Sequence, residues 1–249
     1  MKTSPYNKLY SQIDFLKKPF GYDADYLLWR TAKLKRELVQ FITKDGCILD
    51  VGGGTGIMAQ FLPDFIDRKN YYNSDVSSEM LKYSRYQNVL AAAETLPFSD
   101  SSFDYVISSD VLEHVNDKTR ALSECYRVLK PGGLFLLSTP RSGWGKDFRT
   151  SLFLPFILID SALHRLHRKK PKFLVPEGIK DEPSDENWLK ESLKNVGFLV
   201  LEQYRADNHV PWGNGGESKF WRWFSDRFVN PRKYGHCTIV ICKKVTSEN

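Results

Sequence analysis

A glycine-rich segment and one downstream carboxylate form a pattern that suits a nucleotide-like ligand. Three glycines alternate with other residues directly after the apolar run 47–51, at Gly52, Gly54 and Gly56. Glycines at such a position permit a tight turn and let the backbone approach a ligand closely. Asp75 ends the next expected strand, far enough downstream to accept hydrogen bonds from ribose hydroxyls. A glycine-rich turn without a ligand is the alternative, and the presence of Asp75 makes it the weaker explanation.

The spacing of the glycines separates two classes of ligand. Dinucleotide-binding loops follow a Gly-x-Gly-x-x-Gly pattern, in which the third glycine allows close packing of helix and strand. Counted from Gly52, the position of that third glycine is occupied by Ile57. The Gly-x-Gly-x-Gly spacing present here needs no pyrophosphate in the ligand, and it disfavours a nicotinamide-dependent oxidoreductase.

Alternating strands and helices must position these residues. We expect strands over 47–51, 71–75, 88–92, 103–109 and 134–138, and helices over 23–42, 55–65, 77–86 and 117–129, the last stopped by Pro131-Gly132-Gly133. A helix over 185–196 and strands over 198–204 and 236–245 follow. Such alternation indicates an α/β fold with a parallel sheet covered on both faces. Ligands of these folds bind beyond the carboxyl ends of the strands, here the loops after Val51, Asp75, Ala92 and Ser109.

Six segments of the sequence, in order, resemble the signatures of a known family. They are Asp50–Gly56, Asp75, Ala93–Phe98, Phe103–Asp104, Asp110–Val115 and Arg127–Gly133. Together they look like the type 11 family of class I S-adenosylmethionine-dependent methyltransferases, relatives of the quinone-biosynthesis C-methyltransferases. The resemblance covers about residues 35–140 and is far more specific than a single glycine loop. It implies a Rossmann-like, seven-stranded, mostly parallel sheet with helices on both faces and a reversed last strand.

The resemblance also implies which residues bind S-adenosyl-L-methionine. The loop from Gly52 to Gly56 would wrap its methionine part, and Asp75 would accept hydrogen bonds from both ribose hydroxyls. The backbone of Ala93 and Glu94 would meet the adenine edge. The full expected set is Asp50, Gly52, Gly53, Gly54, Gly56, Asp75, Val76, Ala93, Glu94, Ser109 and Asp110. Family members often carry Asp where this chain has Ala92, so Glu94 or Ser109 could take over adenine recognition.

Two ionisable residues beside this site have two interpretations each. Asp50 would cap the glycine loop by accepting backbone N–H groups, or it would hold the methionine ammonium indirectly. His114 could be the general base that removes a proton from the acceptor, because its reference pKa is about 6.5; the alternative is a positioning residue at a helix start. Methyl transfer from a sulfonium needs no metal, since alignment of the reacting atoms supplies much of the acceleration. The four cysteines lack a CxxC spacing, so no metal site is expected.

The expected domain organisation separates cofactor binding from acceptor binding. Residues 1–42 form an N-terminal helical cap or lid, 43–139 the cofactor-binding core, 140–235 the acceptor-site insertions and 236–245 the final core strand. The net charge of +6 lies wholly in residues 141–249, which hold 19 basic and 13 acidic side chains. We expect a small-molecule acceptor there. An RNA or protein acceptor is the alternative, but no nucleic-acid-binding module is recognisable, and nucleic acid is not the expected partner.

A basic segment supports one more hypothesis about the acceptor. Apolar residues of 152–170 recur at helical spacing, and this segment ends in Arg165, Arg168, Lys169 and Lys170. Such a helix could lie on a membrane or bind a lipid-linked or anionic acceptor, whereas packing on the core with a solvated basic end is the interpretation that we favour. Neither a signal peptide nor an apolar run near the ~20 residues of a spanning helix is recognisable, so a cytoplasmic location is expected. The sequence gives no indication of the oligomeric state.

Overall fold

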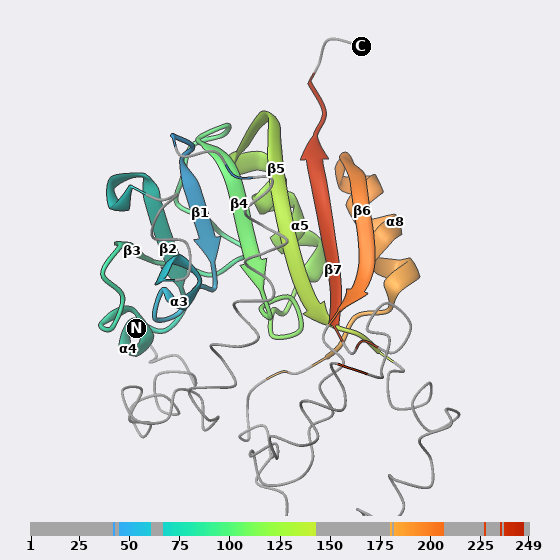
Figure 1. Cartoon of the computed structure of the whole chain (residues 1–249), viewed down its shortest axis with the longest axis horizontal. Coiled ribbons are helices and arrows are strands. Elements are labelled where there is room, and N and C mark those ends of the chain that lie inside the picture. The colour runs from blue at the N-terminus through green and yellow to red at the C-terminus, as the bar shows by residue number, and fades with distance from the viewer. Residues whose placement is uncertain are drawn as a thin grey trace, which may run out of the picture.

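Seven strands form one mixed sheet. A computed structural model of the chain describes residues 42, 45–60, 67–142, 180, 182–206, 227, 235 and 237–246. The strands are β1 (Ile48–Val51), β2 (Tyr71–Asp75), β3 (Gln87–Leu90), β4 (Phe103–Ser109), β5 (Leu129–Pro140), β6 (Phe198–Ala206) and β7 (Cys237–Lys244) (Figure 1). Their order is β3-β2-β1-β4-β5-β7-β6, and β7 is antiparallel to both of its neighbours, whereas β1 to β5 are parallel. The expected α/β fold with seven strands and a reversed last strand is confirmed.

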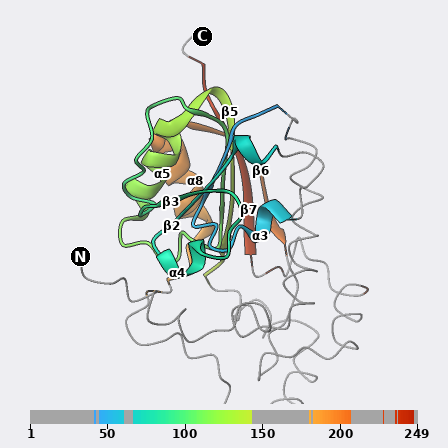
Figure 2. The same ribbon diagram turned by 90° about the vertical axis from the view of Figure 1, so that its left-hand side faces the viewer.

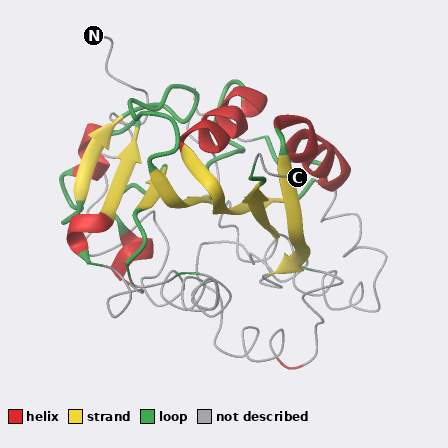
Figure 3. Cartoon of the chain, turned by 90° about the horizontal axis from the view of Figure 1, so that it is seen from above, coloured by secondary structure: helices red, strands yellow, loops and turns green. Residues whose placement is uncertain are grey.

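Helices cover both faces of this sheet. α5 (Lys118–Val128) and α8 (Glu186–Val196) lie side by side on one face, and α3 (Ile57–Gln60) lies on the other (Figures 2 and 3). Successive residues of a strand point to opposite faces, so alternate side chains enter two separate hydrophobic clusters. Leu49 belongs to the cluster with residues of α5 and α8, and Ile48 to the cluster with residues of α3. Two short helices, η2 (Arg68–Asn70) and α4 (Ser78–Leu81), flank β2.

The two long helices begin and end close to where the sequence predicts. Asp117 is the N-cap of α5, and its side chain accepts a hydrogen bond from the N–H of Arg120 (2.9 Å). Asp185 caps α8 in the same way. Such side chains satisfy backbone donors that have no partner within the helix. α8 ends at Val196 and is capped by Gly197, whose φ of 110° lies in the region that favours glycine.

The helix expected over 77–86 is shorter in the structure. α4 ends at Leu81, because the side-chain amide of Asn88, on β3, donates to the carbonyls of Leu81 (3.0 Å) and Ser84 (3.3 Å). Carbonyls at the end of a helix need partners, and Asn88 supplies them from outside the helix. Hydrophobic periodicity does not reveal a partner that comes from the next strand, so the expected helix was too long.

β5 begins earlier than the strand expected over 134–138, and α5 ends before the expected stop. Leu129 pairs with Phe103 and Leu134 pairs with Tyr105, so the residues between them form a bulge in β5. The φ of Gly132 is 78°, a conformation that glycine supplies readily at a bulge. The Pro-Gly-Gly segment therefore continues the strand rather than forming a separate turn.

Lys244, near the end of β7, takes the place of a conventional cap at the end of α5. Its Nζ donates to the carbonyls of Tyr126 (2.8 Å) and Leu129 (2.7 Å), and it lies 4.6 Å from the centroid of the Tyr126 ring. Hydrogen bonds from charged groups are worth about 1.5–3 kcal/mol. Because Lys244 is only half-buried, we expect Lys244→Ala to lower the free energy of unfolding by about 1–2 kcal/mol, as measured by urea denaturation.

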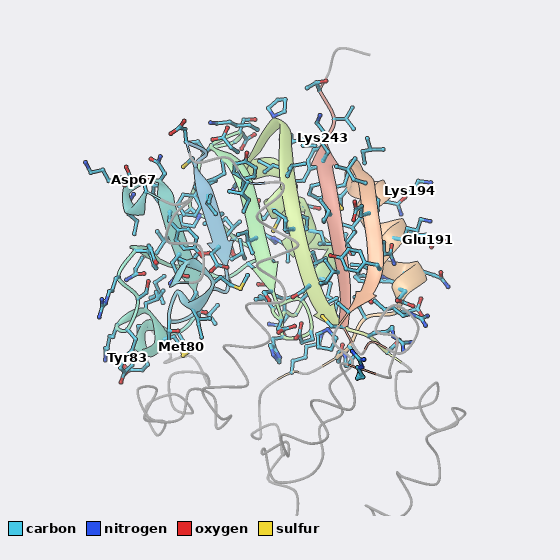
Figure 4. The ribbon with its side chains drawn as sticks, in the orientation of Figure 1. Asp67, Met80, Tyr83, Glu191, Lys194 and Lys243 are labelled. Carbon is cyan, nitrogen blue, oxygen red and sulfur yellow. The ribbon has the colours of Figure 1, made fainter. Side chains whose placement is uncertain are left out.

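Lys243 provides the matched control for this prediction. It is the preceding residue of the same strand and is exposed. In Figure 4 it lies at the end of the strands away from Met80 of α4. Lys243→Ala should change the free energy of unfolding by less than about 0.5 kcal/mol. Equal effects of the two substitutions would show that the contacts to α5 do not stabilise the fold.

Several expectations fall on other parts of the chain. The helix expected over 23–42 and the basic segment 152–170 lie outside the described residues, apart from Ile42, as does most of 140–235. The division into cap, core and acceptor-site segments therefore stays a prediction. Within the described part, no helix is both long and apolar enough to cross a membrane. The same residues contain no cluster of His, Cys, Asp and Glu that could hold a metal ion.

Candidate cofactor site

The candidate site lies at the carboxyl edge of the sheet, where parallel strands end together. Figure 1 shows β1, β4 and β5 pointing toward this edge. The chain passes from β1 to β2 on one side, while β4 pairs with β1 on the other, so the strand order reverses at this point. Such a switch point forms the ligand-binding crevice of open α/β sheets. The residues expected to bind the cofactor come from the loops and strand ends of this region.

The backbone of the loop after β1 requires its glycines. Gly52, Gly54 and Gly56 have φ angles of 72°, 54° and 73°, in the left-handed region that glycine adopts at little cost. The N–H of Gly52 donates to the carbonyl of Ser74 (2.7 Å), which ties the loop to the end of β2. A Cβ on Gly52 would lie 2.3 Å from the side chain of Val111. The loop therefore keeps bare backbone close to the strand ends.

Asp75 connects the glycine loop to the start of α4. Its Oδ2 accepts a hydrogen bond from the N–H of Gly54 (3.0 Å), and its Oδ1 accepts one from the N–H of Ser77 (2.7 Å). A carboxylate has about four acceptor positions, so capacity for ligand hydroxyls remains. Burial raises the pKa of Asp75 to about 6, and the backbone N–H groups oppose that rise. The next residue, Val76, is 36% exposed and places an apolar surface beside the carboxylate.

Asp50 is fully buried, and its partner is a tyrosine rather than the loop backbone. The hydroxyl of Tyr71 donates to Oδ2 of Asp50 (2.5 Å), while Oδ1 has no hydrogen-bond partner among the described residues. Burial and the charge of Asp75 raise the pKa of Asp50 to about 7, and the Tyr71 hydrogen bond opposes this rise. No backbone N–H of the described chain donates to this carboxylate, so the expectation that Asp50 caps the loop is wrong. The other expectation, an indirect hold on the methionine ammonium, stays a prediction.

Two buried polar residues of β2 that belong to no sequence motif support the loop. Tyr71 holds Asp50, and Nδ2 of Asn73 donates to the carbonyl of Gly54 (2.9 Å). A Cβ on Gly53 would lie 2.2 Å from Oδ1 of Asn73 and 2.3 Å from Oδ2 of Asp50. The sequence contained a signal for both residues: polar side chains at every second position of a strand point to one face, which is unusual for a strand buried on both faces.

The residues considered for adenine recognition already have partners. The carboxylate of Glu94 accepts the N–H of Asn116 (2.8 Å), at the start of α5, and the hydroxyl of Ser109 contacts that of Ser138 (2.8 Å). The side chain of Ala93 is buried, and the carbonyl of Ala92 accepts the N–H of Thr95 in a turn (3.0 Å). Glu94 thus fixes the loop that leads into α5. The backbone of this turn remains the expected neighbour of the adenine edge.

The loop after β4 carries Asp110, Glu113 and His114. Asp110 has a φ of 55°, and its N–H donates to the carbonyl of Ser138 (2.9 Å). Nδ1 of His114 lies 2.6 Å from the carbonyl oxygen of Lys180, which can only accept, so Nδ1 carries the proton. Nε2 of His114 lies 4.0 Å from Oε1 of the buried Glu113. The imidazole is one-third exposed.

The sheet with its reversed β7, together with the glycine loop and Asp75 at the switch point, defines a class I S-adenosylmethionine-dependent methyltransferase fold. A solved structure of an S-adenosylmethionine-dependent methyltransferase from Mesorhizobium loti has the same fold, with a TM-score of 0.57. The alignment covers 85% of this chain and 96% of that chain, at 16% sequence identity.

Comparisons of sequence establish the family. Residues 49–137 match the family model described as methyltransferase domain. The malonyl-[acyl-carrier protein] O-methyltransferase of Pectobacterium atrosepticum is 30% identical over 83% of this chain and 85% of the relative. The ubiquinone/menaquinone biosynthesis C-methyltransferase UbiE of Rickettsia felis is 35% identical over 61% of this chain and 67% of the relative. The chain belongs to the type 11 family of S-adenosylmethionine-dependent methyltransferases, as its six motifs predict.

S-adenosylmethionine is therefore the cofactor, and the described residues fit it in two respects. The glycine loop has no side chains at the positions where the backbone must approach a ligand. Asp50 offers a buried carboxylate oxygen that no described group pairs with, which suits a ligand that brings its own positive charge.

Proposed function

We propose that this chain transfers the methyl group of S-adenosylmethionine to a small anionic acceptor, which residues 143–179 and 207–234 help to bind. The observation that carries the proposal is where these two segments join the described core. The first begins after the two residues that follow β5 and the second begins directly after β6, both at the carboxyl edge that holds the glycine loop. An acceptor bound by these segments would therefore lie on the same side of the sheet as the cofactor.

The return of the first segment supports a role for it close to the chemistry. The N–H of Ser142 donates to the carbonyl of Ser184 (3.0 Å), so the two ends of the segment are held together. On the way, the carbonyl of Lys180 accepts from His114 (2.6 Å), and the N–H of Glu182 donates to the carbonyl of Glu113 (2.9 Å). The segment thus re-enters the core beside the candidate base.

In this proposal three groups of the chain hold the cofactor. The carboxylate of Asp75 accepts hydrogen bonds from the ribose hydroxyls, and the backbone of Gly52 to Gly56 surrounds the methionine part. Asp50 provides the negative charge opposite the methionine ammonium. Bound S-adenosylmethionine supplies an electrophilic methyl group on a sulfonium. The protein must then orient the acceptor and remove any proton that its reacting atom carries.

The anionic character of the acceptor is supported by charge and by one relative. The excess positive charge of the chain lies in residues 141–249. The relative that covers 83% of this chain, and therefore much of this region, is named for an acidic acceptor, malonyl-[acyl-carrier protein]. The UbiE relative covers only 61% of the chain. An RNA acceptor, or an unmodified protein, gains no comparable support.

The acceptor class can be tested by supplying S-adenosylmethionine labelled in its methyl group. The purified chain is incubated with malonyl-acyl carrier protein, with carrier protein lacking the malonyl group, and with total RNA. We expect label in the malonyl sample alone, released by mild base as a methyl ester would be. Label in RNA, or equal label in both forms of the carrier protein, would contradict a small anionic acceptor.

His114 is proposed as the general base for an acceptor whose reacting atom carries a proton; a carboxylate such as that of the malonyl group is already ionised at neutral pH and needs no base. Because Nδ1 donates to Lys180, the lone pair of the neutral ring is on Nε2, which can accept a proton. General bases contribute about 10²- to 10⁴-fold to a rate. With an acceptor of that kind we expect His114→Ala to lower kcat by about 100-fold or more while the Kd for S-adenosylmethionine changes less than twofold.

A second substitution separates this role from a structural one. His114→Gln keeps a polar side chain that can donate to the carbonyl of Lys180 but has no basic nitrogen. If His114 only positions the returning segment, the glutamine variant should retain most of the activity. An unchanged kcat in both variants would remove His114 from the chemistry, and single-turnover rates with the labelled cofactor measure the effect.

A further inference from the structure

We propose that Tyr71 is a positioning residue for the methyl-transfer reaction: its hydroxyl fixes one oxygen of Asp50, so that the other oxygen serves the methionine ammonium of the cofactor. The inference rests on the proposed function, which assigns the methionine part to the glycine loop. Tyr71 matches no motif of the sequence, lies at the start of β2, and is completely buried.

The sheet register brings Tyr71 and Asp50 together. In the parallel pair of β1 and β2, Tyr71 lies opposite Ile48, two residues before Asp50. Residues two apart in a strand share a face, so the side chains of Ile48 and Asp50 both lie on the face that Tyr71 contacts. The phenol spans this offset and ends with its hydroxyl 2.5 Å from Oδ2 of Asp50.

The surroundings keep the ring in place. Tyr71 belongs to the hydrophobic cluster with Ile48 and Ile107, and its ring centroid lies 4.7 Å from that of Tyr86. A closely packed ring has few alternative rotamers. The direction of the hydroxyl, and with it the orientation of the Asp50 carboxylate, is therefore determined by the core of the protein rather than by the ligand.

The carboxylate itself is incomplete without a further partner. Oδ1 of Asp50 is buried and lacks a hydrogen-bond partner in the described part of the chain. A buried polar atom without a hydrogen-bond partner costs free energy, and such atoms in native structures call for an explanation. Oδ2 of the same group lies against Gly53, where a Cβ would be 2.3 Å away. A cationic group entering along the bare loop backbone would meet a carboxylate that is already oriented.

The ionised form of Asp50 also depends on the hydroxyl of Tyr71. Burial and the neighbouring Asp75 raise the pKa of Asp50 to about 7, and the Tyr71 hydrogen bond is what opposes them. Burial and the charge of Asp50 raise the pKa of Tyr71 well above its usual value, so the phenol keeps its proton and acts as the donor. Asn73, which also lies against Gly53, is neutral. Without the hydroxyl, Asp50 would keep its proton to higher pH and would offer no negative charge to an ammonium group.

The test compares two ligands on two variants. S-adenosylhomocysteine carries the amino-acid part of the cofactor, whereas 5′-methylthioadenosine lacks it and keeps the ribose and adenine. Tyr71→Phe preserves the ring and removes only the hydroxyl. Tyr72→Phe is the matched control, because Tyr72 is the next residue of β2, packs against Phe98 and Phe103 on the other face, and does not contact Asp50.

Isothermal titration between pH 6 and pH 8.5 should give a pH-dependent loss. Because loss of the hydroxyl raises the pKa of Asp50, Tyr71→Phe should weaken S-adenosylhomocysteine binding about tenfold at pH 6 and less than twofold at pH 8.5. Affinity for 5′-methylthioadenosine should be unchanged within twofold at every pH, and Tyr72→Phe should match the wild type throughout. Titration of the ligand amino group is common to all variants and cancels in the ratio.

A double variant connects the effect to Asp50. In an Asp50→Asn background, Tyr71→Phe should cause no further loss of S-adenosylhomocysteine affinity, because the titrating group is gone. An equal loss for both ligands, or a loss independent of pH, would show that Tyr71 is structural only and would overturn the inference. Unchanged S-adenosylhomocysteine affinity in Tyr71→Phe would overturn it as well. Failure of the wild type to bind either ligand would instead contradict the proposed function.

Discussion

Replacement of Asp75 by alanine is expected to weaken the binding of S-adenosylmethionine by about 1–3 kcal/mol, or roughly 5- to 150-fold. The carboxylate lies at the end of β2, beside the glycine loop, and it already accepts the N–H of Gly54 (3.0 Å). Its removal deletes the acceptor for the ribose hydroxyls and frees the loop that it holds. Both effects act in the same direction on affinity, which isothermal titration measures.

Two further variants make the result specific. Asp75→Asn keeps one acceptor oxygen and should lose less affinity than the alanine variant. Asp67→Ala removes an exposed carboxylate from the opposite edge of the sheet (Figure 4), where it caps only η2, and should leave the Kd unchanged. Wild-type affinity in Asp75→Ala would remove this residue from the cofactor site.

Gly53→Ala is expected to have an equally large effect, for steric reasons alone. A Cβ at this position would lie 2.2 Å from Oδ1 of Asn73 and 2.3 Å from Oδ2 of Asp50. Neither side chain can retreat easily, because Asn73 is bonded to the carbonyl of Gly54 (2.9 Å) and Asp50 to Tyr71 (2.5 Å). Relief of the clash must move the loop backbone, so we expect S-adenosylmethionine affinity to fall by about 100-fold and the fold to lose about 1–3 kcal/mol.

Gly132 supplies the control for the glycine substitution. Gly132 lies in the bulge of β5, far from the glycine loop. Its φ of 78° makes Gly132→Ala strained, but the nearest atom to a new Cβ is 3.7 Å away. This variant should lose about 1 kcal/mol of stability through backbone strain and no cofactor affinity. If both alanine variants bind the cofactor as the wild type does, the packing of Gly53 against Asn73 and Asp50 has no bearing on binding.

Local sequence patterns were sufficient to predict most of the core. β2 and β4 have the predicted bounds, because each lies between clear turn signals. The N-caps Asp117 and Asp185 were predictable for the same reason: the signal and its effect lie within one helical turn. The end of α4 and the start of β5 were not, since each depends on a partner in another strand, Asn88 in one case and Phe103 in the other.

The residues of the candidate site also differ in whether a local sequence pattern predicts them. The glycines and Asp75 occur at fixed spacings, so the sequence alone indicated a ligand and its approximate place. The partners that support the loop, Tyr71 and Asn73, act across the sheet register and follow no motif. Glu94, by contrast, was considered for adenine recognition from the sequence, whereas in the structure its carboxylate accepts the N–H of Asn116. The acceptor depends on long segments without a recognised motif, which is why its class is a proposal.

A crystal structure of the chain with S-adenosylhomocysteine bound tests the location of the cofactor site most directly. We predict both ribose hydroxyls within hydrogen-bond distance of the Asp75 carboxylate and the amino-acid part along Gly52 to Gly56, on the side of Asp50. Val76 should pack against the adenosine. A ligand bound at another edge of the sheet, or one whose ribose does not contact Asp75, would contradict the site described for this methyltransferase.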